Sequence, residues 1–253
     1  PLCGTITTDM AIAALKGENL GKGKTTDMLC VSYSQTDVIG HEWGTRGEHT
    51  DGAYLELDKD IARLLKALDE QVGEGNYLLF LTADHGGAHN FQWMQDHGLN
   101  GGAWNMWQDI APQMEAYLKE KLGEAASLKV IASVNSYRIY LDRAYIAHRG
   151  LDYEKVKETV VTFAKTAPHV VFAVDFEKIQ TSSLPDLLRY RGLMGYHPRR
   201  SGDILLFLEP GWYEFGKGSS PVGTTHGEWN PYDAHIPLVF YGWKVENGST
   251  SRE

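Results

Sequence analysis

Asp and His residues occur in three short groups that could bind a metal ion. Asp37 and His41 stand four residues apart, Asp84 and His85 are adjacent, and His226 lies in a loop between glycines. Carboxylate and imidazole ligands together favour zinc or a similar divalent transition ion, whereas Mg²⁺ and Ca²⁺ prefer oxygen ligands. The sequence therefore predicts a divalent-metal site. Asp37 and His41 can bind the same ion if the turn between them is helical, because residues four apart share one helix face.

The two apolar runs that precede the first two groups are predicted to be strands. They cover 28–34 (MLCVSYS) and 77–83 (YLLFLTA), and the second is apolar almost throughout, which favours a central parallel strand covered on both faces. In open α/β sheets, ligands lie in the crevice beyond the carboxyl ends of the strands. We therefore expect Asp37 and Asp84 at one edge of a sheet, with His85 reaching inward only where the chain turns.

The rest of the sequence alternates helical and strand patterns, which favours an α/β fold with a mainly parallel sheet and flanking helices. The character of the chain changes after residue 94, and we expect 95–202 to form a small α+β insertion in a core made of 1–94 and 203–253. The first helix is expected to have Thr7 or Thr8 as its N-cap. Helices are predicted over 8–18, 50–72, 110–122, 153–166 and 184–191, and strands over 28–34, 77–83, 128–134, 137–141, 170–176, 204–209, 211–215 and 236–241.

Composition excludes several classes of protein. The 253 residues are 42% hydrophobic and 23% charged, as in an ordinary globular protein. The formal net charge of −9 makes a nucleic-acid backbone a poor partner, and no apolar stretch is long enough to span a membrane. The two cysteines, Cys3 and Cys30, cannot form a disulfide-rich scaffold. We expect them to be buried or loosely placed thiols, with a disulfide between them as the alternative.

Taken in order, the motifs resemble those of the alkaline phosphatase superfamily. The resemblance is strongest to the nucleotide pyrophosphatase/phosphodiesterase-like alkaline phosphatases of Gram-negative bacteria, and it extends over nearly the whole chain. The motifs that carry it are Asp37-x-x-x-His41, Thr82-Ala83-Asp84-His85-Gly86 and Thr225-His226-Gly227. Further matching segments are Ser34-Gln35-Thr36-Asp37, the run 54–60 (YLELDKD), Arg200-Ser201-Gly202-Asp203 and His235-Ile236-Pro237-Leu238.

The resemblance implies a site with two zinc ions. It assigns Asp37, His41 and His226 to one ion and Asp84 and His85 to the other. In the family, the second ion also binds an Asp and the nucleophilic Thr or Ser, and both belong to an N-terminal half that we do not find in this sequence. We therefore expect a fragment that lacks that half and the extreme C-terminus. On this basis no catalytic nucleophile is assigned in this chain, and we expect weak occupancy of the second zinc position and no turnover.

Four other residues have types that could contribute to the same site. Thr7 or Thr8 at a helix N-terminus could in principle replace the nucleophile, although a plain N-cap role is favoured. His89 lies four residues after His85, and we expect a supporting or surface position. His235 could hydrogen-bond a ligand carboxylate, or it could simply precede a strand.

The resemblance implies zinc-dependent hydrolysis of small phosphate monoesters through a phospho-Thr or phospho-Ser intermediate. A phosphodiesterase or nucleotide pyrophosphatase of the same superfamily is the near alternative. A non-catalytic zinc-binding module is the second alternative, because no nucleophile is assigned. Export to the periplasm or beyond also follows from the resemblance. Strands without neighbours would leave an open sheet edge, through which the chain could form oligomers.

Overall fold

The computed structural model describes residues 2–216 and 219–250. Its residues cluster into two compact units, and each unit is built from segments that are far apart in the sequence. The first unit consists of Pro1–Gly87, Ser220–Thr224 and His235–Glu253, and the second of Ala88–Ser219 and Thr225–Ala234.

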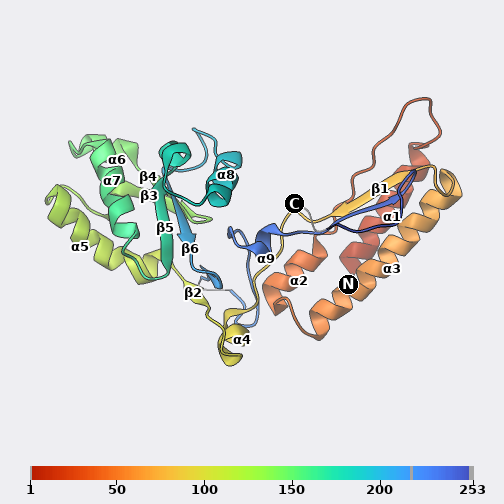
Figure 1. Cartoon of the computed structure of the whole chain (residues 1–253), viewed down its shortest axis with the longest axis horizontal. Helices are drawn as coiled ribbons and strands as arrows, with labels where there is room; N and C mark the ends of the chain where they lie inside the picture. Colours follow the sequence, from red (N-terminus) through yellow and green to blue (C-terminus); the bar gives the residue numbers. More distant parts are fainter. Residues whose placement is uncertain (1, 217–218, 251–253) are drawn as a thin grey trace. The chain divides into compact units, whose positions relative to one another are not determined.

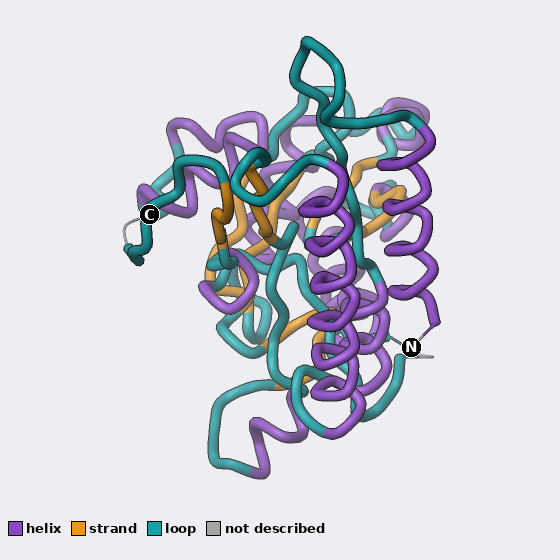
Figure 2. The backbone as a smooth tube through the Cα atoms, turned by 90° about the vertical axis from the view of Figure 1, so that its right-hand side faces the viewer, coloured by secondary structure: helices purple, strands orange, loops and turns teal. Residues whose placement is uncertain are grey.

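Two long helices of the first unit, α1 (Leu2–Gly17) and α3 (Glu48–Gln71), lie side by side (Figure 2). The apolar residues of α3 recur at helical spacing, and Leu64 and Ala67 on one face are buried. The amide of Gln71 donates to the carbonyl oxygen of Leu15 at 2.6 Å, which ties the ends of the two helices together. The shorter α2 (Gln35–Trp43) packs against α3 and carries the first Asp–His pair.

The sheet of the first unit has two antiparallel strands, β1 (Leu78–Thr82) and β8 (Leu238–Gly242). Phe80 of β1 and Phe240 of β8 are each about half exposed. The prediction of a strand at 77–83 is therefore confirmed, but the prediction that it is parallel and covered on both faces is wrong for the described residues. An apolar run is equally compatible with either strand direction, so the sequence pattern could not decide it.

The second unit is built on a four-stranded antiparallel sheet with the strand order β3-β4-β6-β5. All five residues of β6 are buried, which explains its unbroken apolar sequence. The four strands are β3 (Ile131–Asn135), β4 (Arg138–Leu141), β5 (Val170–Asp175) and β6 (Ile204–Leu208).

Helices cover both faces of this sheet (Figure 1). Helices α5 and α7 bury Met114, Leu118 and Val156 in the larger core cluster, and the segment from η3 to α8 encloses the smaller cluster around Phe176 and Phe207. The helical elements are α4 (Phe91–Asp96), η1 (Met106–Ile110), α5 (Ala111–Leu122), η2 (Leu128–Val130), α6 (Arg143–His148), α7 (Tyr153–Ala164), η3 (Phe176–Thr181), α8 (Asp186–Met194) and α9 (Pro231–Ala234). A short parallel pair joins β2 (Gly102–Trp104) to β7 (Trp212–Glu214).

The mixed α/β class predicted from the sequence is confirmed, but three details differ. Strand pairing is mainly antiparallel in the described part of the chain. Residues 28–34 form no strand, because no ladder partner lies beside them among the described residues. The second compact unit also includes β6, which we expected in the core formed by 1–94 and 203–253, because β6 pairs with β4 and β5.

The predicted N-cap role of Thr7 and Thr8 is wrong. Helix α1 already includes Leu2, so both threonines lie within it. The Thr7 hydroxyl donates to the carbonyl oxygen of Cys3, four residues earlier, at 2.9 Å. This bond lets a threonine occupy the interior of a helix. The hydroxyl of the fully buried Thr8 hydrogen-bonds to that of Tyr33 at 2.9 Å.

Both cysteines are free and exposed, which agrees with loosely placed thiols and not with buried thiols or with the alternative of a disulfide between them. Within the described residues, no helix combines the length and the apolar character needed to cross a bilayer.

Candidate metal centre

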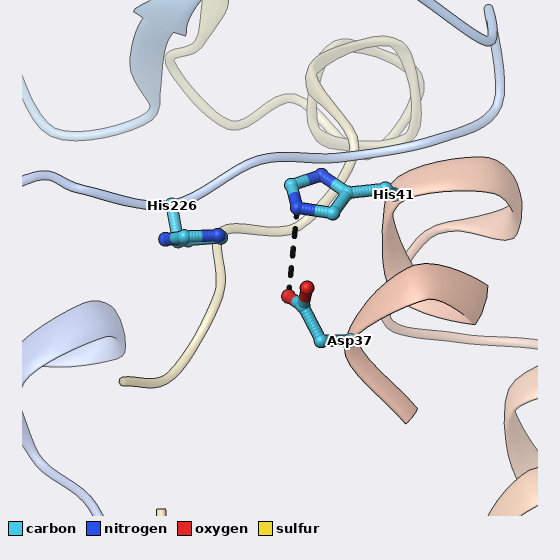
Figure 3. A group of neighbouring side chains, drawn as sticks. All are labelled: Asp37, His41 and His226. Carbon is cyan, nitrogen blue, oxygen red and sulfur yellow. Dashed lines mark ion pairs between the residues drawn. The ribbon is translucent and has the colours of Figure 1, made fainter. Parts of the chain in front are cut away.

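Helix α2 brings the first predicted Asp–His pair together. Asp37 lies in the first turn of the helix and His41 in its last turn. Asp37 Oδ1 and His41 Nε2 are 3.5 Å apart, with both side chains about 40% exposed (Figure 3). The turn between Asp37 and His41 is helical, so the two side chains share one helix face, as their four-residue spacing requires.

The segment 220–224 holds one side of α2 in place. The Thr224 amide donates to the carbonyl oxygen of Gly40 at 3.1 Å, and the Ser220 hydroxyl donates to that of Glu42 at 2.6 Å. The Thr224 carbonyl oxygen lies 2.9 Å from His41 Nδ1 and accepts a hydrogen bond from it. The His41 ring is therefore fixed by a backbone group, with Nε2 directed toward Asp37.

His226 follows this segment and completes a three-residue group. One ligand atom from each of Asp37, His41 and His226 lies within 4.8 Å of the other two. In Figure 3 the three side chains converge, with the His41–Asp37 pair drawn as a dashed line. The structure thus brings together the three residues that the resemblance assigned to one ion.

Asp84 and His85 follow β1 directly, as predicted. His85 Nε2 lies 3.7 Å from Asp84 Oδ2 and 3.8 Å from Asp37 Oδ1. His85 Nδ1 lies 2.7 Å from the carbonyl oxygen of Gly86 and donates to it. The chain turns after β1, so the neighbouring side chains of Asp84 and His85 approach each other instead of pointing to opposite faces.

Two imidazole nitrogens lie near the Asp37 carboxylate. The Nδ1–H groups of His41 and His85 donate to carbonyl oxygens, so each ring presents its Nε2 atom to Asp37. The two Nε2 atoms lie 3.5 and 3.8 Å from the same carboxylate oxygen. Metal-binding histidines commonly donate their other N–H to a carbonyl group in this manner.

Comparison with known proteins identifies the family of this chain. Residues 4–232 match the type I phosphodiesterase / nucleotide pyrophosphatase family. The chain belongs to this family. The matched range contains Asp37, His41 and His226 and the four-stranded antiparallel sheet, and it ends before β8.

Several curated relatives of this family align with the whole chain. Alkaline phosphatase PafA of Elizabethkingia meningoseptica is 38% identical over 252 residues, which are 100% of this chain and 45% of PafA. A Myroides odoratus protein named calcium-transporting ATPase is 40% identical, with 100% of this chain and 45% of that protein covered. Alkaline phosphatase PhoV of Synechococcus elongatus is 33% identical, with 100% and 44% covered.

The fold agrees with that of a solved relative. The crystal structure of wild-type PafA matches the chain with a TM-score of 0.90 at 38% identity, covering 100% of this chain and 46% of that one. The predicted alkaline-phosphatase-like fold is thereby confirmed. The chain spans about half the length of the curated relatives it matches.

The other two histidines weighed from the sequence, His89 and His235, lie in different surroundings. The His89 ring packs on Trp93, with ring centroids 4.9 Å apart. His235 is exposed and precedes β8. A supporting role in metal binding stays a prediction for both.

The loop that follows His226 contains two buried acidic residues, Glu228 and Asp233. The Glu228 amide donates to Asp233 Oδ2 at 2.7 Å, and Glu228 Oε2 accepts from the Asn230 amide at 2.9 Å. Burial raises the pKa of Glu228 to about 8, with a smaller contribution from the nearby Asp233. Glu228 lies two residues beyond His226, and its buried environment has no local sequence signal.

Gly223 offers a direct test of the packing between 220–224 and α2. A Cβ atom at this position would overlap the carbonyl oxygen of His41. We expect Gly223→Ala to push the segment away from α2, to lower the free energy of unfolding of the first unit by about 1–3 kcal/mol, and to weaken metal binding. Thermal unfolding and zinc titration measure the two effects.

The matched control is Gly40→Ala, because a Cβ at Gly40 meets no atom within 4 Å. Since Ala is favoured over Gly inside a helix, this control should be neutral or slightly stabilising. Equal behaviour of the two variants would show that the close approach of Gly223 does not hold the segment.

Glu214 of β7 supplies a pH-dependent test of the second unit. Burial raises the pKa of Glu214 above its ordinary value of 4.5. The folded state therefore favours the neutral form of the Glu214 carboxyl group. The stability that this group contributes is fully present below its ordinary pKa and is lost as the pH rises through its folded-state pKa. We expect Glu214→Gln, which stays neutral, to gain thermal stability relative to the native chain as the pH rises from 4 to 9. The exposed Glu158→Gln on α7 is the control, and an identical pH dependence of both variants would contradict the expectation.

Proposed function

We propose that this chain forms the zinc-binding part of a phosphoric ester hydrolase of the alkaline phosphatase type. The observation that carries the proposal is the convergence of Asp37, His41 and His226 within 4.8 Å. Its support is the family assignment and the two relatives named alkaline phosphatase. Cleavage of small phosphate monoesters is the activity we propose for the whole protein.

The donor set of the three-residue group fits zinc. One carboxylate and two imidazoles make up the ligand number and types of a catalytic zinc site, which keeps a further position for water or substrate. The Nδ1–H of His41 is bound by the Thr224 carbonyl group, which orients Nε2 for such an ion. For a second ion we propose Asp84 and His85, of which His85 is oriented in the same manner by the Gly86 carbonyl group.

Bound zinc would supply Lewis-acid stabilisation of the charged oxygens of a phosphate ester. The residues of this chain contribute position and charge. Asp37 would partly neutralise the charge of the ion, and the backbone carbonyl groups of Thr224 and Gly86 accept from Nδ1–H of His41 and His85. No residue of this chain is assigned as the nucleophile: Thr8 is buried and its hydroxyl is bonded to Tyr33. We propose that the nucleophile lies elsewhere in the intact enzyme.

Diester cleavage is the second candidate, because the family that matches residues 4–232 is described as type I phosphodiesterase / nucleotide pyrophosphatase. The test compares 4-nitrophenyl phosphate with bis(4-nitrophenyl) phosphate as substrates of the natural, full-length protein. We expect faster monoester hydrolysis that is lost after chelation and restored by zinc. A rate that survives chelation would contradict zinc dependence, and a faster diester rate would favour the second candidate.

The 253-residue chain should be assayed beside the full-length protein. We expect it to bind about one zinc ion and to show no hydrolysis above that of its His226→Ala variant. A clear zinc-dependent rate from the chain itself would show that it contains its own nucleophile. Export from the cytoplasm, which the resemblance also implies, stays a prediction.

A further inference from the structure

The helix that carries the Asp37–His41 pair has little apolar packing of its own. None of the nine residues of α2, all of which the structure describes, is buried. The Ser34 side chain, at the N-terminus of α2, makes no capping hydrogen bond to the helix. Isolated helices of this length are marginal in water. The positions of Asp37 and His41 therefore depend on the bonds that join α2 to its neighbours.

The C-terminal end of α2 receives three hydrogen bonds from outside the helix. Two come from the segment 220–224, which donates to the carbonyl oxygens of Gly40 and Glu42. The third comes from Thr50, whose hydroxyl donates to the carbonyl oxygen of Gly44, the C-cap of α2, at 2.7 Å. The last carbonyl groups of a helix lack partners within it, so these bonds satisfy them and fix the end of α2 in place.

Thr50 lies on a rigid element. It belongs to the first turn of the 24-residue helix α3, and it is 6% exposed. The far end of α3 is tied to α1 by the bond from the Gln71 amide to the Leu15 carbonyl oxygen, and Leu64 between the two ends is buried. Because a buried hydroxyl has exchanged its water partners for a protein partner, loss of its bond is costly. Gly44 is thus bonded to a helix that is fixed by its own packing.

The bond from Thr50 acts on the turn that contains His41. The Gly44 amide donates to the Gly40 carbonyl oxygen at 2.8 Å and closes the last turn of α2 around His41. Gly44 has a φ of +80°, and glycine has more backbone freedom than any other residue. Release of Gly44 would let this turn open, and the 3.5 Å separation of His41 Nε2 from Asp37 Oδ1 would no longer be maintained.

We propose that Thr50 is a positioning residue for the Asp37–His41 pair. Its hydroxyl holds the last turn of α2 against α3 and keeps His41 in place relative to Asp37 before a metal ion binds. A ligand that is already in place avoids the entropy cost of being ordered on binding. The inference rests on the proposed metal-binding role of Asp37 and His41, and it adds a residue from the following helix.

The test uses Thr50→Val, which keeps the branched shape of the side chain and removes the hydroxyl. Thr50→Ser retains the hydroxyl and is the rescue variant. The matched control is Thr159→Val on α7, because Thr159 is 9% exposed and its hydroxyl donates to the Lys155 carbonyl oxygen at 2.7 Å.

Three quantities are measured on the natural, full-length protein. Hydrogen exchange of the amides at 41–44, without metal, reports the order of the last turn of α2. Competition with a chelator gives the zinc affinity. The absorption spectrum of the cobalt(II)-loaded protein reports the ligand geometry.

We expect Thr50→Val to speed exchange at the Gly44 amide several-fold. Zinc affinity should fall roughly 10-fold, the lower end of the range for residues that support metal ligands, and the cobalt spectrum should change. Thr50→Ser should stay close to the native protein in all three quantities. Thr159→Val loses a buried hydrogen bond of the same kind, so it should lower thermal stability and leave exchange at 41–44, zinc affinity and the spectrum unchanged.

Three results would overturn the inference. One is unchanged exchange at 41–44 in Thr50→Val. Another is faster exchange with native zinc affinity and an unchanged cobalt spectrum, which would reveal a purely structural role. The third is a Thr50→Ser variant that behaves like Thr50→Val, since the hydroxyl would then not be the group that acts. A native protein that binds no zinc would remove the proposed metal site instead, and the exchange data would still show whether Thr50 holds the last turn of α2.

Discussion

Asp37→Ala is expected to lower zinc affinity more than about 100-fold, since loss of a direct ligand should exceed the 10–100-fold cost of losing a supporting partner. Asp37 contributes the carboxylate of the three-residue group, and its Oδ1 atom also lies 3.8 Å from His85 Nε2. Its removal leaves only imidazole ligands in the group, and these carry no negative charge to balance that of the ion. Elemental analysis after dialysis against a weak chelator, followed by chelator competition, measures the change.

The control for this variant is Asp58→Ala, which removes an equal charge from an exposed position on α3. It should retain the native zinc content, and His226→Ala should behave like Asp37→Ala. Unchanged zinc content in both Asp37→Ala and His226→Ala would remove the basis of the proposed site.

Lys157→Met should produce the largest loss of stability in the second unit. The Lys157 side chain is only 3% exposed, and its ammonium group lies 3.0 Å from both Asp175 Oδ2 and Glu154 Oε1. Burial alone would lower the pKa of Lys157, but the carboxylates of Asp175 and Glu154 raise it above its ordinary value. The residue is therefore a charged lysine inside the protein, held by its partners.

Removing one partner of a buried ion pair leaves the other charge uncompensated, which costs about 3–5 kcal/mol. We expect Lys157→Met to lower the free energy of unfolding of the second unit by that amount, measured by denaturant titration. Lys155→Met on the exposed face of α7 is the matched control. The double variant Lys157→Met/Asp175→Leu should recover part of the loss, because it removes the stranded carboxylate. A loss below about 1 kcal/mol in Lys157→Met would show that water solvates the pair.

Local sequence patterns predicted the elements that depend on local spacing. The apolar repeat of 50–72 gave a helix observed as Glu48–Gln71, and the run 77–83 gave a strand observed as Leu78–Thr82. The prediction of a strand at 28–34 was wrong, because a strand also needs a pairing partner, and local sequence does not identify that partner. The pairing of β6 with β4 and β5 was not predicted for the same reason.

The same distinction between local and distant contacts applies to the candidate site. The convergence of Asp37, His41 and His226 was predictable, because their residue types and motif order carry a chemical signal. The contact of the Thr224 carbonyl group with His41 was not. It joins segments that are far apart in the sequence.

Diffraction at the zinc absorption edge, from crystals of the chain grown with zinc, tests the central claim most directly. An anomalous difference map locates the ion independently of affinity and of activity. We predict a strong peak within bonding distance, about 2.0–2.2 Å, of Asp37, His41 and His226. A map with no peak at these residues, or with its strongest peak at other side chains, would contradict the account.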